Sequence, residues 1–333
     1  MTTLTVEIVA TDAALFALRP EWDDLWRRTP DASPFQSPAW LLPWWRQFGT
    51  GLPRVAVLRE HETLAGVLPL YVLDEPPARK LLPIGAGLTD YQDALLAPGT
   101  PPDAAHLLLQ AVLRGAVGDG VTACDLIDVP PDASLRRAAS ASASAEYWHS
   151  ADPCPVLALP AGNDGLRGCI PSDTHRKLRM NRHRAERIGG ATMARATAET
   201  LPALLEALFR LHEARWSGEG VLGDPRVRAF HREAAPLLLA IGALRLQVLW
   251  LSGEIVAACY ALLAGRQRIL FYLTGYDTAF ARQSPGTLLL GAMLEEAIRE
   301  GRSEAHFLRG AERYKYAWGG QDRMNATCRV LPA

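Results

Sequence analysis

The order of elements in residues 244–315 constrains the fold more than any other feature of the chain. Apolar runs separated by short turns predict an antiparallel meander of strands, here at 244–251, 254–263 and 269–276. We expect the third strand to end in a turn at 274–277. A helical pattern from Pro285 to Glu300 follows, and a short apolar run at 305–308 predicts one more strand.

The helix in this region opens with Ser284-Pro285-Gly286. Ser284 is expected to be an N-cap that accepts hydrogen bonds from the first N–H groups, and Pro285 suits the first helical position. Gly286 has no side chain to hold a ligand away from the backbone. Together with the helix dipole, this start predicts an anion site, for which the diphosphate of a coenzyme is the candidate ligand. The competing interpretation is an ordinary, well-formed helix start.

This order of elements resembles the Gcn5-related N-acetyltransferase (GNAT) fold, in which the helix after the fourth strand receives the diphosphate of coenzyme A. The family signature there is Arg or Gln, two residues, Gly, one residue, then Gly or Ala. Gln283 and Gly286 match it, whereas Leu288 stands where a small residue is expected. The resemblance implies acyl-CoA (acetyl-CoA) as co-substrate, bound by Gln283, Ser284, Pro285, Gly286, Thr287 and Tyr272.

A closer resemblance is to the two-domain acetyltransferases of the BioF2-like or cellulose-biosynthesis type, which are similar to the Fem peptidoglycan aminoacyltransferases. Three motifs carry it: Phe35–Trp40 with Trp44-Trp45, the Ser-Pro-Gly helix start, and Phe307–Gly310 through Tyr314-Lys315 to Trp318-Gly319. The resemblance implies an α/β protein with tandem GNAT-like (Fem-like) modules. Each module would be a mixed, mostly antiparallel sheet flanked by helices.

The first half of the chain repeats the order of the second, which predicts a duplicated module. We expect an N-terminal module at 1–160, a C-terminal module at 161–320, and a strand in 321–333 that returns to the first module, as in Fem-like proteins. Only the second module has the Ser-Pro-Gly start. We therefore assign the acyl donor to the second module and the acceptor to the first.

Acyl transfer from a thioester needs an activated acceptor, a stabilised oxyanion and a protonated thiolate. The sequence has no Gly-x-Ser-x-Gly elbow and no phosphate loop, so direct attack in a ternary complex is preferred over an acyl-enzyme. Asp90 is the candidate base and Asp93 the second choice, although a turn-forming Asp is the alternative. The Fem resemblance places Asp90 and Tyr91 at the acceptor site.

In the Fem proteins that this chain resembles, a lysine one turn before an aromatic-Gly pair stabilises the acyl donor. Tyr314-Lys315 stands at the corresponding position of this sequence, and the resemblance implies the same role for Lys315. The Lys315 ammonium could supply positive charge to the oxyanion, or it could be an ordinary surface lysine. Tyr272 and Tyr276 are candidates for protonating the thiolate. The candidate substrate-binding residues are Tyr91, Asp93, Trp216, Arg309, Arg179 and Arg182.

Residues 172–187 predict a helix that contains six arginines and lysines and two histidines. It is either a solvated face or a site for a phosphate-bearing substrate such as RNA or a nucleotide sugar. The net charge of −1 does not favour binding of nucleic acid by the overall charge of the protein. The leading alternative to an acyl-CoA enzyme is a Fem-type aminoacyltransferase that uses aminoacyl-tRNA. A non-catalytic partner in exopolysaccharide assembly is a further alternative.

The five cysteines are never arranged as CxxC, which favours a reduced chain and indicates no zinc site or other metal site. The N-terminal residues lack a signal-peptide pattern, and charged residues interrupt the apolar stretches. We therefore expect a cytoplasmic protein with no membrane span. Its expected activity is N- or O-acyl transfer to a small-molecule or saccharide acceptor.

Overall fold

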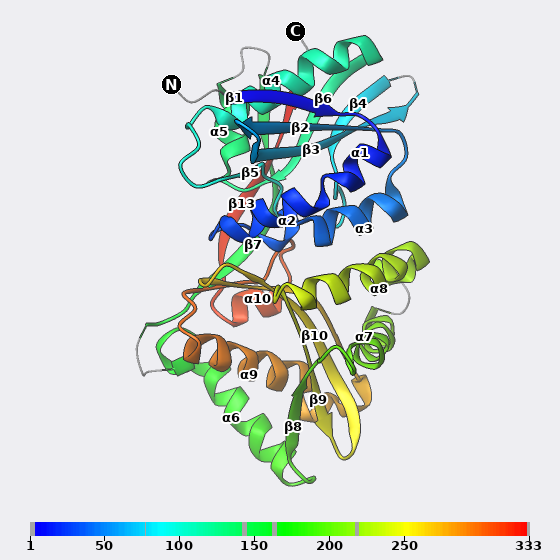
Figure 1. Cartoon of the computed structure of the whole chain (residues 1–333). Coiled ribbons are helices and arrows are strands. Elements are labelled where there is room, and N and C mark those ends of the chain that lie inside the picture. The colour runs from blue at the N-terminus through cyan, green and yellow to red at the C-terminus, as the bar shows by residue number, and fades with distance from the viewer. Residues whose placement is uncertain (1–3, 77, 142–144, 162–164, 217–219, 332–333) are drawn as a thin grey trace. The chain divides into compact units, whose positions relative to one another are not determined.

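The computed structural model describes residues 4–76, 78–141, 145–161, 165–216 and 220–331. The chain divides into two compact units, residues 1–153 with 323–333 and residues 154–322. Each unit contains its own paired strands and its own covering helices (Figure 1). The predicted fold class, α/β with mixed and mostly antiparallel sheets flanked by helices, is confirmed.

The strands of the first unit pair in the order β1-β2-β3-β4-β6-β13, and β5 also pairs with β3. All of these pairs are antiparallel except the parallel pair of β4 and β6. The strands are β1 (Leu4–Val9), β2 (Leu52–Glu60), β3 (Thr63–Glu75), β4 (Ala78–Pro83), β5 (Leu95–Leu96), β6 (Val121–Val129) and β13 (Gln321–Val330).

Helices pack on both faces of this first sheet. α4 and α5 share a core with the side chains of β2 and β3 that include Leu58 and Leu70. On the other face, the rings of Trp44 and Trp45 contact Tyr71. The helices are α1 (Asp12–Ala17), α2 (Arg19–Arg28), η1 (Pro34–Gln36), α3 (Pro38–Phe48), α4 (Ala104–Ala116), η2 (Val117–Asp119) and α5 (Ser134–Ser140).

The strands of the second unit pair in the order β7-β12-β11-β10-β9-β8. The meander of β9, β10 and β11 is antiparallel, as predicted, and only β11 and β12 are parallel. The strands are β7 (Ala145–Ala158), which begins in the first unit, β8 (Ala191–Arg195), β9 (Leu244–Leu251), β10 (Glu254–Ala264), β11 (Arg268–Tyr276) and β12 (Glu304–His306).

Helices also cover both faces of the second sheet. α6 and α9 share a core with Cys259 and Phe271, whereas His231 of α8 contacts Tyr260 from the other face. The helices are η3 (Gly165–Gly168), α6 (Ser172–Glu186), α7 (Leu201–Trp216), η4 (Val221–Gly223), α8 (Pro225–Ala240), η5 (Thr278–Gln283), α9 (Pro285–Arg299) and α10 (Arg313–Ala317).

The turn expected at 274–277 is wrong, because β11 continues through Tyr276 and the chain turns only at Asp277. The reason is the close packing of α7 on β11. A Cβ atom on Gly275 would lie 2.4 Å from the backbone nitrogen of His212 in α7. The glycine therefore permits a close helix–strand approach and does not form a turn.

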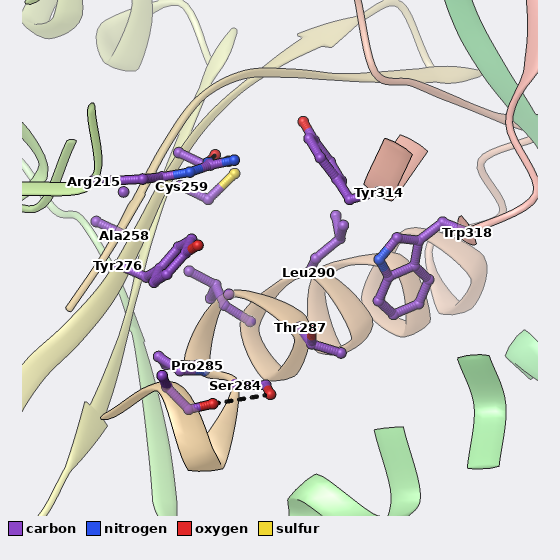
Figure 2. Close-up of a pocket in the computed structure, with 15 residues that line it drawn as sticks. Arg215, Ala258, Cys259, Tyr276, Ser284, Pro285, Thr287, Leu290, Tyr314 and Trp318 are labelled. Atoms are coloured by element: carbon purple, nitrogen blue, oxygen red, sulfur yellow. Dashed lines mark hydrogen bonds between the residues drawn. The ribbon is translucent and has the colours of Figure 1, made fainter. Parts of the chain in front are cut away.

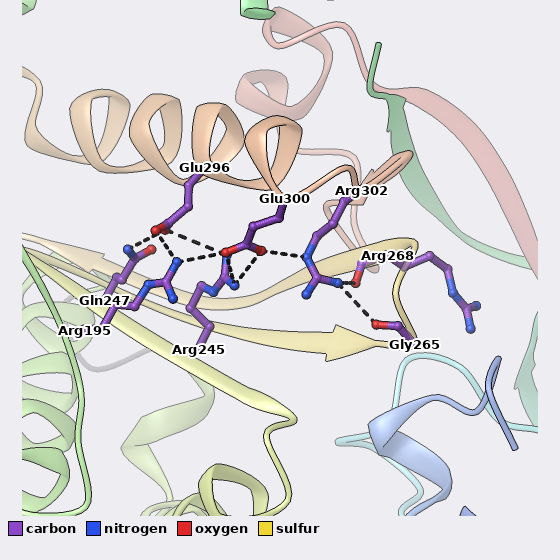
Figure 3. A network of polar contacts seen from close by, with 8 residues as sticks. All are labelled: Arg195, Arg245, Gln247, Gly265, Arg268, Glu296, Glu300 and Arg302. Atoms are coloured by element: carbon purple, nitrogen blue, oxygen red, sulfur yellow. Dashed lines mark hydrogen bonds and ion pairs between the residues drawn. The ribbon is translucent and has the colours of Figure 1, made fainter. Parts of the chain in front are cut away.

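The carboxyl-terminal half of α9 is fixed to the sheet by a polar network that Figure 3 shows. Arg245 of β9 is buried, and its Nη2 donates to both carboxylate oxygens of Glu300, at 2.8 and 2.7 Å. Arg195 of β8 donates to Glu300 at 3.0 Å, and Gln247 Nε2 donates to Glu296 at 2.8 Å. This network sets the position of α9, whose first turn lies at the pocket described below.

Two buried histidines lie between the sheet and α7 and α8. The His231 ring is fully buried, with its centroid 5.3 Å from the ring of Tyr260 and 5.7 Å from that of Tyr272. Burial, and to a lesser extent the nearby His212, lower the pKa of His231 to about 3. Burial, with Arg215 and Arg228 nearby, lowers the pKa of His212 to about 4.

These histidines predict a specific acid sensitivity. Below pH 6.5 the unfolded chain takes up protons that the folded chain excludes, so the free energy of unfolding falls as pH drops from 6.5 towards 4. Each histidine contributes up to about 1.4 kcal/mol per pH unit in that window. We expect His231→Leu to flatten this slope in urea unfolding between pH 7 and pH 4. Equal slopes for the variant and the wild type would contradict the assignment.

Candidate functional site

β11 and β12 separate shortly after they pair. Their parallel register covers only three pairs, the last between Leu270 and His306. β12 ends at His306, while β11 continues for six more residues to Tyr276. A strand edge that loses its neighbour exposes backbone groups, and such an opening in a sheet can admit an extended ligand.

A pocket of about 290 Å³ lies at the far end of β11, within the second unit. Its walls come from α7, the middle of β10, the end of β11, η5, the first turns of α9, and α10 with the residue after it. In Figure 2, Arg215 and Tyr276 lie on one side of the pocket, Tyr314 and Trp318 on the other, and α9 runs along one wall. The lining residues that the argument uses are Arg215, Cys259, Thr274, Tyr276, Ser284, Gly286, Thr287, Tyr314 and Trp318.

The start of α9 differs from the sequence prediction in one respect. Ser284 is the N-cap, but its side chain makes no capping hydrogen bond. Its backbone is left-handed (φ 51°), so its carbonyl accepts from the N–H groups of Thr287 (2.9 Å) and Leu288 (3.1 Å). The hydroxyl instead donates to the carbonyl of Ala281 at 3.3 Å. The expected cap is therefore wrong, because the preceding turn of η5 sets the Ser284 backbone.

Gly286 is the first residue of α9 that carries an N–H, since Pro285 has none. Gly286 lines the pocket, and its N–H has no hydrogen-bond partner within the described part of the chain. A Cβ atom at this position would lie 3.3 Å from the ring of Tyr276. The helix start thus presents a backbone donor and the positive end of a helix dipole to the pocket.

Arg215 is the only charged side chain among the described residues that line the pocket. Its Nη1 donates to Thr274 Oγ1 of β11 at 2.8 Å. The guanidinium carbon lies 5.1 Å from the ring centroid of Tyr276 and 5.8 Å from that of Tyr314. Cation–π contacts of this kind hold a guanidinium in place.

The thiol of Cys259 and the phenol of Tyr314 both stay neutral in the pocket. Burial raises the pKa of Cys259 well above its usual range, which keeps this thiol from acting as a nucleophile. Burial, and then Glu312, raise the pKa of Tyr314, whereas Arg215 opposes this shift. Tyr314 is therefore suited to donate a hydrogen bond from its Oη and not to supply a phenolate.

No cluster of three or more potential metal ligands occurs among His, Cys, Asp and Glu of the described residues. In the same part of the chain, no helix is both long enough and apolar enough to cross a bilayer.

Comparison with known proteins decides the family of the second unit. Residues 172–316 match the model of a family described as an acetyltransferase (GNAT) domain. This segment is a GNAT-type acyltransferase domain. The comparison with curated proteins gave no significant match.

Solved structures share the two-domain fold of the whole chain at low identity. FemX has a TM-score of 0.68 at 12% identity, covering 94% of this chain and 96% of that chain. The C-terminal domain of a putative lysylphosphatidylglycerol synthetase from Agrobacterium fabrum has a TM-score of 0.63 at 12% identity, covering 94% and 92%. A tandem GNAT protein from the clavulanic acid biosynthesis pathway has a TM-score of 0.51 at 14% identity, covering 99% of both chains. The resemblance to two-domain GNAT-like proteins is confirmed at the level of the fold.

The pocket of the GNAT domain brings together six of the residues that the sequence predicted for the site: Tyr276, Ser284, Pro285, Gly286, Thr287 and Tyr314. Sequence reasoning missed Arg215, Cys259 and Thr274, and it quoted Trp318 only as part of a motif. The glycine at 275 was the available signal for Arg215, because a glycine inside a strand indicates the close approach of another backbone.

Lys315 lies outside the pocket lining and is almost fully buried. Its Nζ donates to the carbonyls of Leu308 (3.0 Å), Arg309 (2.7 Å) and Gly310 (3.1 Å), and it lies 2.8 Å from Glu312 Oε2. An ammonium group has only three N–H bonds. In this conformation all three are used within the protein, so an oxyanion role would require the lysine to change partners.

The other residues predicted for the second unit lie apart from the pocket lining. Gln283 ends η5, and Tyr272 faces His231 on the opposite face of the sheet. Arg179 is exposed on α6, whereas Arg182 forms a 2.7 Å ion pair with Glu295 of α9. Arg309 contributes its carbonyl to Lys315. Trp216 ends α7, and its side chain lies outside the described part of the structure.

The residues predicted for acceptor binding lie in the first unit. Asp90 and Tyr91 are both 7% exposed, and the Asp90 carbonyl accepts from Asn325 Nδ2 at 2.7 Å. Asp93 Oδ1 accepts from the N–H of Leu135 and the hydroxyl of Ser134, both at 2.8 Å. Burial raises the pKa of Asp93, although these hydrogen bonds oppose the shift. Asp93 thus acts as the cap of α5.

The contacts of Lys315 predict that this residue is needed for stability. Lys315→Met removes the partner of three carbonyls and of Glu312 together, which we expect to cost about 3–5 kcal/mol. For a domain of this size that loss should lower the melting temperature by roughly 10 °C. Lys177→Met, which removes an exposed lysine of α6, is the control and should melt like the wild type. If Lys315→Met keeps its stability but loses turnover, the oxyanion role predicted from the sequence is supported instead.

Proposed function

We propose that the protein transfers an acyl group from acyl-CoA to an amine or hydroxyl of a small-molecule or saccharide acceptor. The observation that supports it most is the pocket that joins the open edge of β11 to the first turn of α9. The Gly286 N–H can donate a hydrogen bond to a diphosphate, and the positive end of the helix dipole attracts its negative charge. The strands β11 and β12 separate after Leu270 and His306, and we propose that the extended arm of the coenzyme lies where they separate.

In this proposal the acceptor attacks the thioester directly. The carbonyl carbon forms a bond to the acceptor, the C–S bond breaks, and the acceptor proton passes to a general base. Tyr314 would donate a hydrogen bond to the departing sulfur. Because its pKa lies above that of an ordinary thiol, Tyr314 would stabilise the thiolate without giving up its proton.

A second candidate function is transfer of an aminoacyl group from tRNA. The observation that favours it is the face of α6 that carries Arg176, Lys177, Arg179 and Arg187, all of them exposed. These basic residues span about 11 positions, or roughly 17 Å along the helix, which suits a row of backbone phosphates better than one small ligand. The Fem resemblance adds to this candidate at the level of the fold.

Ligand-induced stabilisation separates the two donors, because a ligand that binds only the folded state raises its melting temperature. We expect acetyl-CoA to raise the melting temperature and charged tRNA to leave it unchanged. Gly286→Val should weaken coenzyme A binding by about tenfold or more, since the valine crowds the Tyr276 ring and covers the first helix N–H.

The matched control is Gly115→Val in α4, where a Cβ atom meets nothing closer than 3.9 Å. It should keep the affinity of the wild type for coenzyme A in titration calorimetry. Unaltered affinity in Gly286→Val would show that the phosphates do not bind at α9. A melting shift with charged tRNA alone would favour the second candidate.

A further inference from the structure

α6 packs against α9 and against the turn that precedes it. Leu178 of α6 lies in the space that Gly291 leaves on α9, because a Cβ atom on this glycine would be 2.8 Å from both methyl carbons of Leu178. Farther along α6, Arg184 Nη1 donates to the carbonyl of Arg282 in η5 at 3.3 Å. These contacts hold α6 beside α9 within the second unit (Figure 1).

This packing brings two guanidinium groups to the edge of the pocket. Arg282 directly follows Ala281, which lines the pocket, and it lies two residues before Ser284 at the start of α9. Arg184 reaches the same turn from α6. Both arginine side chains are exposed, so a ligand that leaves the pocket at this end can meet them.

The contacts of the two arginines leave their charges available. Arg184 donates only to neutral oxygens, the η5 carbonyl and Asn181 Oδ1, at 3.3 and 3.4 Å. The nearest carboxylates along the chain have other partners, since Glu186 Oε2 lies 3.1 Å from His183 Nδ1 and Asp277 caps η5. Among the described residues, neither arginine forms an ion pair with a carboxylate. Such a pair of charges favours an anionic group.

Coenzyme A carries a further phosphate close to its diphosphate. The diphosphate joins the arm that ends in the thioester to an adenosine whose ribose bears a 3′-phosphate. The proposed function puts the thioester beside Tyr314, which lies away from Ser284 and Pro285 in Figure 2. With the diphosphate at the start of α9, the adenosine therefore leaves the pocket at the end where the two arginines lie.

We propose that Arg184 and Arg282 bind the 3′-phosphate of the coenzyme. The proposal rests on the function proposed above and adds a binding subsite to the same site. A phosphomonoester carries a charge of about −1.5 to −2 at neutral pH, and guanidinium groups bind phosphate oxygens through paired N–H bonds. The enzyme then distinguishes coenzyme A from its 3′-dephospho form, although both have the same thioester arm and diphosphate.

The experiment compares coenzyme A with 3′-dephospho-coenzyme A on the full chain by titration calorimetry. The test variant combines Arg184→Gln with Arg282→Gln, which removes both charges and keeps polar side chains. The control is Arg266→Gln, because Arg266 is also exposed but lies in the turn before β11, at the opposite end of that strand from the pocket. Melting temperatures of all variants are measured alongside.

We expect the wild type to bind coenzyme A about tenfold more tightly than the 3′-dephospho form at low salt, which is modest because both arginines are exposed. The double variant should reduce this ratio to about one and keep the affinity of the wild type for the 3′-dephospho form. Arg266→Gln should keep the ratio of the wild type. Added salt should lower the ratio in the wild type, since it screens exposed charges.

Three results would overturn the proposal. The first is a wild type with equal affinity for the two coenzymes, and the second is a preference that survives in the double variant. The third is an equal loss of affinity of the double variant for both coenzymes, which would make the two arginines ligands of the diphosphate or structural residues. A wild type that binds neither coenzyme is a different result, because it refutes the proposed donor itself and this subsite with it.

Discussion

The arrangement of the pocket in the GNAT domain depends on the separation of β11 from β12. After Leu270 and His306 the two strands no longer pair, and the chain must satisfy the backbone groups of residues 307–312 in another way. Lys315 does so for three consecutive carbonyls, which converge on its ammonium. These three hydrogen bonds hold the segment before α10 in place, and α10 in turn positions Tyr314 in the wall of the pocket.

Two residues near this opening have a backbone conformation that non-glycine residues rarely adopt. Leu308 has φ 60°, and Ser284 has φ 51°. A left-handed conformation costs about 1–2 kcal/mol at such a residue, so the surrounding structure must stabilise it. At Leu308 the contact with Lys315 does this, and at Ser284 the two N–H groups of α9 that bond its carbonyl do so. Ser284 itself lines the pocket, whereas Leu308 precedes α10, the helix that carries the lining residue Tyr314.

The chemistry of the pocket follows from burial more than from the identity of its polar residues. Cys259 and Tyr314 would each be reactive in water near neutral or alkaline pH, but burial keeps them neutral. Among the described residues that line the pocket, Arg215 is the one with a charged side chain. The fold that this chain shares with FemX and the other two-domain proteins does not specify a substrate, because one fold supports many sites. The specificity of the enzyme must therefore follow from the side chains that line its site.

The sequence by itself determined the elements whose signals are local. β9 has the bounds that the pattern predicted, since strand alternation and the turn at Ser252-Gly253 each act over a few residues. The helix beginning at Pro285 was located for the same reason.

Only the tertiary structure decided what the polar side chains do. Asp93 caps a helix that begins 41 residues later, and Arg215 bonds a threonine 59 residues away, so neither partner is visible in the local sequence. Lys315 is close to its partners in sequence, yet its three bonds exist only because the separated strands turn those carbonyls to one point. Local patterns fix backbone conformation through short-range forces, whereas the role of a charged side chain depends on which distant segments pack around it.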